Sequence, residues 1–390
     1  MIIVLLRLKF DLGLSLFAGG ALTGLCAGLG LPRVLTTLAS SCIKGPTVHL
    51  LLAIILIMFL AEVASHHGYL ERFTRALQKL ISDRRVNMCL IPAFGGLLPM
   101  PGGAMWSAPL VNSISGDSGV SAEEKTFINY WFRHVWEYVL PLYPGVVVAS
   151  AILGIPIEKL VIAQAPLSGA AIVSGALVVF WKIKKVDAGE RRERPRVRDF
   201  ADLFMGLWPF AFVIVLVLVF KADLLAVIVS TILIIGLLEK TGVRQMLLLG
   251  RRSFSLSTIS VILGVMAFKE VMERGGVVHV LPGLLGSLHF PGVLVLFLVP
   301  MVVGLLTGIT QAFVGVAFPV ILPFLNASSA RLPHAAVAYA GGFLGVLLSP
   351  VHLCLVLTHQ YFEARLGGVY LLMIFPAAFV ALVALLFGLR

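Results

Sequence analysis

Long uninterrupted apolar runs are the feature that most limits how this chain can fold. Within lipid, every backbone N–H and C=O must find a partner inside the protein, which only helices and closed barrels achieve. A spanning helix needs about 20 apolar residues, so such runs predict an all-α polytopic membrane protein with about 9–11 spans. Continuous candidate spans cover residues 10–31, 48–64, 125–153, 158–181, 203–220, 222–238, 255–272, 335–362 and 368–389.

The overall composition excludes a soluble protein. Apolar residues make up 59% of the 390 residues, charged residues make up 13%, and the mean hydropathy is +1.02. Soluble domains are about half apolar and a quarter charged. The net charge of +11 is interpreted as basic cytoplasmic loops rather than as a nucleic-acid site. The four cysteines have no metal-like or CxxC spacing, so they are interpreted as packing residues and no cofactor is expected.

Two further apolar stretches are interrupted in the middle. Residues 87–113 contain LLPMPGGAMWSAP, and residues 293–326 contain LLTGITQAFVGVAFP. A helix that breaks at such Pro, Gly and small polar residues frees backbone groups, which in a bilayer must be buried in protein or line a wet cavity. Both stretches are therefore predicted to be re-entrant hairpins.

A charged linker divides the chain into two similar parts. Residues 182–202 hold eight basic and five acidic residues and separate residues 1–181 from residues 203–390. Across this linker, IPAFGGLLPM (91–100) aligns with VPMVVGLLTG (299–308) at an offset of 208, and other matches keep an offset between 208 and 212. Such a constant offset predicts an internal repeat.

The charges of equivalent loops indicate how the repeats are related. Residues 66–87 carry five Lys and Arg residues, whereas the equivalent residues 273–292 carry one. Because basic residues concentrate in cytoplasmic loops, equivalent loops are expected on opposite sides of the membrane. The two parts are thus predicted to be inverted-topology repeats, with Ser82 and the linker 182–202 cytoplasmic and Ser287 on the opposite side.

Three motifs carry a resemblance to a known family. PMPGGAMWSAPLV, FRHVWEYVLPLYPG and SPVHLCLVLTHQYF resemble an uncharacterised prokaryotic integral-membrane family, a domain of unknown function within the ion transporter superfamily. The resemblance covers almost the whole chain. That superfamily includes organic-anion permeases and arsenite or sodium/proton antiporters, and its members are commonly dimers. The resemblance therefore implies a transporter in the cytoplasmic membrane that forms a homodimer.

The interrupted segments supply the first candidate site residues. Glycines let backbone amides approach a ligand, and helix ends at a break carry partial charges suited to ions. Substrate contacts are expected from both hairpins; a tight turn that only permits close helix packing is the alternative. The candidates are Pro101, Gly102, Gly103 and Ser107 in the first hairpin and Thr307, Thr310 and Gln311 in the second.

A second pair of breaks is expected at Pro141 and at Ser349-Pro350. Proline removes one helix hydrogen bond and displaces the carbonyl four residues back. The carbonyls freed there, with the hydroxyls of Thr307, Thr310 and Ser349, could coordinate Na⁺; a simple kink is the alternative.

Charged and titratable residues inside spans are costly and mark functional candidates. Arg133 and Glu137 are four residues apart, so they could pair on one helix face as a structural clamp. In the functional alternative, Arg133 neutralises an anionic substrate while His134 or Glu137 carries a proton. His352 follows the second Pro break and is a further proton candidate.

These features favour a secondary active transporter over an enzyme. Inverted repeats with broken helices are typical of secondary transporters, and the sequence holds no HExxH, GxSxG or Walker A motif. The expected cargo is a small organic anion or oxyanion, moved with H⁺ or Na⁺; the titratable candidates favour H⁺. An ion channel, or an ion/proton antiporter without an organic substrate, is the alternative.

Overall fold

The computed structural model describes residues 1–8, 10–99, 103–116, 119–184, 196–276, 291–327 and 331–389. All regular secondary structure in these ranges is helical, which confirms the prediction of an all-α membrane protein. Before the linker, the helices are α1 (Ile2–Arg7), α2 (Leu12–Cys26), α3 (Leu31–Cys42), α4 (Gly45–His66), α5 (Tyr69–Leu80), α6 (Arg84–Gly95), α7 (Ala104–Ser115), α8 (Ala122–Arg133), α9 (Pro144–Leu153) and α10 (Ile157–Lys182). After it, they are α11 (Val197–Leu218), α12 (Leu224–Leu238), α13 (Val243–Ser253), α14 (Leu256–Arg274), α16 (Gly292–Thr307), α17 (Thr310–Ala327), α18 (Arg331–Leu348), α19 (Leu353–Tyr361) and α20 (Leu366–Gly388). Most of the predicted linker, residues 185–195, and the predicted outer position Ser287 lie outside the described residues.

Few of these helices are long enough to cross a bilayer unaided. By length and composition, five described segments qualify: α4, α10, α11, α18 taken together with α19, and α20. A sixth is reached if α13 and α14, bent by 57° at their junction, count as one span. The expected 9–11 spans are approached only by adding shorter apolar helices such as α2, α9, α12, α16 and α17.

Helices interrupted midway recur in both parts of the chain. Helices α6 and α7 flank the first predicted hairpin tip, and α16 and α17 flank the second, where Gly308 has a φ of 65° that favours glycine. The structure differs from the expected single span over 125–153, because α8 ends at Arg133 and α9 begins only at Pro144. A similar but shorter gap separates α18 from α19.

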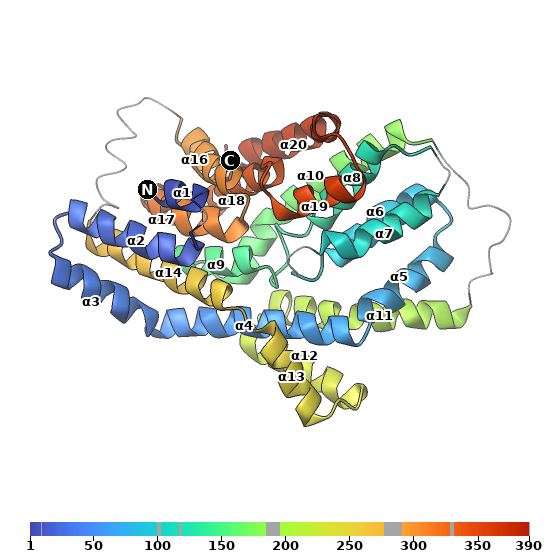
Figure 1. Cartoon of the computed structure of the whole chain (residues 1–390), viewed down its shortest axis with the longest axis horizontal. Coiled ribbons are helices and arrows are strands. Elements are labelled where there is room, and N and C mark those ends of the chain that lie inside the picture. The colour runs from blue at the N-terminus through green and yellow to red at the C-terminus, as the bar shows by residue number, and fades with distance from the viewer. Residues whose placement is uncertain are drawn as a thin grey trace.

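The long α4 runs along the lower edge of the molecule in Figure 1, with α11 beside it and α12 and α13 projecting beyond it. Helices α16 and α20 lie toward the opposite edge, and α9, α17 and α18 lie between the two edges. Many contacts join the two parts of the chain, since α2 packs on α14, α4 on α12 and α13, and α8 on α20. The fold therefore depends on both parts at once.

Glycines permit the close packing of α16 on α18. A Cβ placed on Gly341 or Gly345 would overlap backbone oxygens of α16, and one on Gly304 would overlap a backbone oxygen of α18. Small residues at a helix crossing let the backbones approach, which gives packing energy that lipid cannot supply. The packing of α16 on α18 fixes the position of α18, and therefore also the position of the residues that follow its C-terminal end.

Candidate functional site

A cavity of about 830 Å³ lies where the broken helices meet. Its walls come from both parts of the chain: Pro99 after α6, the end of α8, the α8–α9 break, the α16–α17 break, the start of α2, the first turns of α14 and the start of α19. Polar lining residues are Asp11, Arg133, His134, Glu137, Tyr143, Ser257, Thr258, Thr307, Thr310, Gln311, His352 and Cys354. Of the predicted site residues, seven therefore share one cavity: Arg133, His134, Glu137, Thr307, Thr310, Gln311 and His352.

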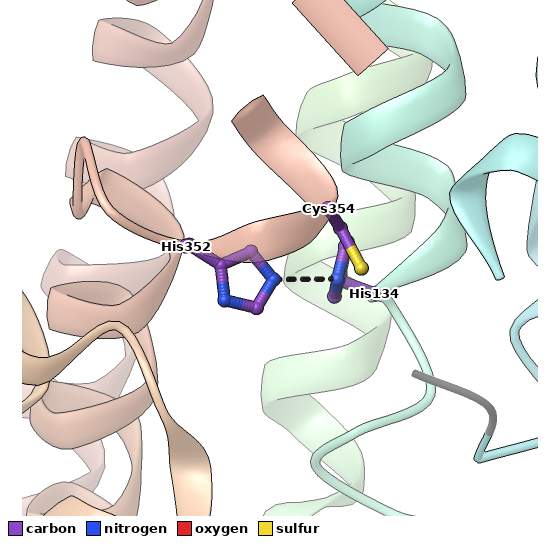
Figure 2. A group of neighbouring side chains, drawn as sticks. All are labelled: His134, His352 and Cys354. Carbon is purple, nitrogen blue, oxygen red and sulfur yellow. Dashed lines mark hydrogen bonds between the residues drawn. The ribbon is translucent and has the colours of Figure 1, made fainter. Parts of the chain in front are cut away.

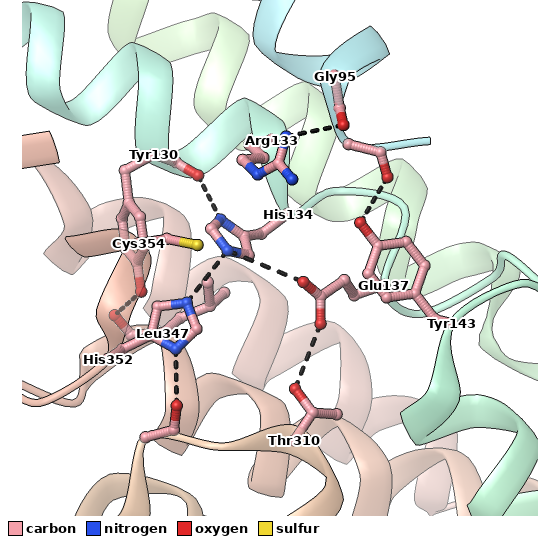
Figure 3. A network of polar contacts seen from close by, with 12 residues as sticks. Gly95, Tyr130, Arg133, His134, Glu137, Tyr143, Thr310, Leu347, His352 and Cys354 are labelled. Carbon is pink, nitrogen blue, oxygen red and sulfur yellow. Dashed lines mark hydrogen bonds and ion pairs between the residues drawn. The ribbon is translucent and has the colours of Figure 1, made fainter. Parts of the chain in front are cut away.

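Side chains at the two ends of the α8–α9 break, Arg133 and Tyr143, bond to carbonyls at the end of α6 and just after it. Arg133, only 3% exposed, donates from Nη1 to the Gly95 carbonyl at 2.7 Å and from Nη2 to the Leu98 carbonyl at 3.4 Å (Figure 3). The Tyr143 hydroxyl donates to the carbonyl of Gly96. The last carbonyls of a helix lack partners within it and carry partial negative charge, so a guanidinium is well suited there. Arg133 thus links the first hairpin to the break after α8.

The expected pairing of Arg133 with Glu137 on one helix face is not what forms. That pairing requires a continuous helix, and α8 ends at Arg133. Glu137 lies in the break, where its Oε2 accepts a hydrogen bond from the Thr310 hydroxyl at 3.3 Å and its Oε1 lies 3.8 Å from His134 Nε2. Its carboxylate therefore connects the α8–α9 break to the second hairpin rather than to Arg133.

Two histidines from opposite parts of the chain face each other. His134 lies directly after α8, His352 lies directly before α19, and their Nε2 atoms are 3.2 Å apart (Figure 3). His134 Nδ1 lies 2.6 Å from the carbonyl oxygen of Tyr130, and His352 Nδ1 lies 2.7 Å from that of Gly308. A carbonyl can only accept, so both Nδ1 atoms carry hydrogen. In the neutral rings, both facing Nε2 atoms consequently present lone pairs.

Cys354 completes this group and was missed by the sequence argument. One ligand atom from each of His134, His352 and Cys354 lies within 4.8 Å of the others (Figure 2). Treating all four cysteines as packing residues hid this one. The signal that could have found it is position, since Cys354 follows His352 by two residues just after a Pro break.

Of the remaining first-hairpin candidates, the described Gly103 and Ser107 are absent from the cavity wall. Pro101 and Gly102 lie outside the described residues, while Gly103 packs so closely on Arg133 that a Cβ there would overlap the guanidinium. Ser107 is buried, and its hydroxyl donates to the carbonyl of Ala104 in its own helix.

Pro141, Ser349 and Pro350, the candidates at the second pair of breaks, do not line the cavity. Pro141 is buried and Pro350 is exposed. Ser349 is fully buried, and its hydroxyl accepts from the Val351 N–H at 3.4 Å. Thr307 lines the cavity, yet its hydroxyl donates to the Val303 carbonyl one turn earlier in α16. The oxygens proposed for Na⁺ are thus distributed around the α16–α17 and α18–α19 breaks.

The fold and this cavity define a helical membrane protein with broken helices around a buried polar site. The chain matches, over residues 1–389, the family described as a protein of unknown function (DUF401), and it belongs to that family. Among curated proteins, none matches the sequence. Its fold is similar to the crystal structure of the YdaH transporter of Alcanivorax borkumensis, with a TM-score of 0.62 and 13% sequence identity over 92% of this chain and 88% of that one.

Proposed function

We propose that this protein is a secondary active transporter that moves a small organic anion or oxyanion across the cytoplasmic membrane by alternating access, coupled to H⁺ or Na⁺. The observation that carries the proposal is the meeting of broken helices from both parts of the chain at one buried polar cavity. Helix ends and freed backbone groups at such a meeting point are how secondary transporters bind their cargo. The fold shared with a transporter supports the same class.

Bonds across the cavity couple the two parts of the chain. The Glu137 carboxylate accepts from the hydroxyl of Thr310, and its backbone carbonyl accepts from the Tyr339 hydroxyl at 3.0 Å. A ligand that replaces such bonds changes how the two parts hold together, which is the coupling that alternating access requires. We assign the transported compound to this interface.

Two contacts between the first and the second part of the chain support the inverted relation of the repeats. Lys44, just before α4, lies 2.6 Å from Glu270 near the end of α14. Tyr69, just after α4, donates to Glu239 shortly before α13 at 3.1 Å. Helices α4 and α14 occupy equivalent places in the two repeats, yet the start of one lies beside the end of the other. In this proposal, the hairpins α6–α7 and α16–α17 enter the membrane from opposite sides.

A ligand screen followed by transport tests the proposal. Purified protein is heated with succinate, citrate, gluconate, phosphate or arsenite, with and without Na⁺, and the apparent Tm is recorded. A ligand at about 100 times its Kd stabilises by about 2.7 kcal/mol, so at least one compound should raise the Tm. The Thr310→Val variant should lose this shift, whereas Thr36→Val, an exposed threonine in α3, should keep it.

Proteoliposomes then separate the alternatives. The radiolabelled hit should accumulate against its gradient with saturable kinetics, driven by a pH gradient in Na⁺-free buffer or by a Na⁺ gradient at constant pH. Currents that do not saturate would indicate a channel, and chemical conversion without accumulation would indicate an enzyme. Proton movement driven by Na⁺ with no organic compound present would indicate an ion/proton antiporter.

A further inference from the structure

We propose that His134, His352 and Cys354 bind a soft divalent cation of the Zn²⁺ class, with Glu137 as a fourth ligand. The proposal does not depend on which compound is transported. It starts from the two facing histidines, whose Nδ1–H groups are both used on carbonyls. Two Nε2 lone pairs 3.2 Å apart repel each other unless a proton or a metal ion lies between them.

The distances fit a metal ion in that place. Two histidine nitrogens at about 2.0–2.1 Å from a tetrahedral Zn²⁺ are about 3.3 Å from each other, and the two Nε2 atoms are 3.2 Å apart. The Cys354 ligand atom is within 4.8 Å of both rings, and Glu137 Oε1 is 3.8 Å from His134 Nε2 (Figures 2 and 3). Small side-chain movements would bring the three ligand atoms of this group onto one ion, and the Glu137 carboxylate, which lies beside His134, is the candidate for the fourth position.

The surroundings of the rings are those of metal-binding histidines. Such histidines almost always donate their other N–H to a carbonyl or carboxylate, which fixes the tautomer and raises the basicity of the ligand nitrogen. Tyr130 and Gly308 supply these carbonyls here. The arrangement also spans the break after α8 and the break before α19, so a bound ion would hold the two parts of the chain together.

The burial of the ligands and the net charge of the complete site indicate which class of ion binds. His134 is 2% exposed and Cys354 is 8% exposed, and an uncompensated charge at such depth is costly. A divalent ion with one thiolate, one carboxylate and two neutral imidazoles has no net charge. Imidazole and thiolate ligands favour Zn²⁺ and similar ions over Mg²⁺, Ca²⁺ or Na⁺, which prefer oxygen.

The test is metal binding by the whole purified protein. After treatment with a chelator, the protein is titrated with Zn²⁺ against a chromophoric chelator, and bound zinc is counted after desalting. We expect about one tight Zn²⁺ per chain. His134→Ala and His352→Ala should each weaken binding about 100-fold or more, since even second-sphere changes cost 10–100-fold. His359→Ala, on the same short helix as Cys354, is the matched control and should bind as the unaltered protein does.

Co²⁺ gives a readout that remains useful if a histidine variant does not fold. A cysteine ligand produces thiolate-to-cobalt charge-transfer absorption in the near ultraviolet, so this band should be present in the unaltered protein and absent from Cys354→Ser. Cys89→Ser, which changes another buried cysteine, should leave it unchanged. The absence of stoichiometric Zn²⁺ binding would overturn the proposal, as would binding that none of the three site variants weakens. A Co²⁺ spectrum of the unaltered protein without the thiolate band would overturn the proposal too, because the site is proposed with Cys354 as a ligand.

Discussion

Arg133 illustrates how a single residue changes role between sequence and structure. Its position within an apolar segment predicts either an anion site or a clamp to Glu137. In the fold, its guanidinium caps the end of α6 through the carbonyls of Gly95 and Leu98. Sequence spacing identified Arg133 as costly and therefore important, but it could not identify the partner, because that partner is the backbone of another helix.

The capping role gives a prediction for stability. Arg133→Gln should lower the free energy of unfolding by about 1–3 kcal/mol, because buried carbonyls lose charged donors. The measurement is thermal unfolding of the purified protein in detergent. Arg252→Gln, at an exposed site near the end of α13, should leave stability unchanged. If Arg133→Gln instead melts like the unaltered protein and only ligand binding is lost, the anion-binding role is the correct one.

At the scale of helices, the sequence predicted which apolar segments are interrupted, but it did not predict the residue at which each interruption begins. Pro and Gly clusters correctly indicated interruptions between α6 and α7 and between α16 and α17. The α8–α9 break was expected at Pro141, yet the helix ends already at Arg133. Hydropathy could not anticipate this, because most residues of the break are apolar or aromatic. Its backbone N–H groups bond locally, as Glu137 does to the His134 carbonyl, while the carbonyls of Val135 and Glu137 accept from Ser168 and Tyr339 in other helices. The convergence of both breaks on one cavity likewise depends on tertiary packing.

Close packing of α16 on α18 gives the prediction for this scale. Gly345→Ala should destabilise the protein by about 1–3 kcal/mol, as overpacked interiors do, since the new Cβ would meet the Met301 backbone oxygen. Gly367→Ala in α20 adds the same methyl group where no atom lies within 4 Å, and it should be neutral or slightly stabilising. Comparing the two Tm values measures the packing effect; equal values would contradict the close approach.

For the whole molecule, the charge asymmetry of equivalent loops predicts the orientation in the membrane. Single cysteines replace Ser82, which follows α5, and Glu273, near the end of α14; both positions are exposed. The background carries Cys26→Ser and Cys42→Ser and retains the two buried cysteines. In intact cells, an impermeant maleimide should label position 273 and spare position 82 until the membrane is opened. Labelling of both positions in intact cells would contradict inverted repeats.

Helices of the first part of the chain pack on helices of the second part, and this has a consequence for biosynthesis. Helix α2 packs on α14, which leaves the ribosome more than 200 residues later, or roughly ten seconds or more at usual elongation speeds. Throughout that interval, the nascent first part has helix faces and polar groups without their final neighbours. A ribosome that stalls in the charged linker therefore releases a product that cannot complete its packing. We expect such a fragment, whose helix faces lack their final neighbours, to be more readily degraded than the finished chain.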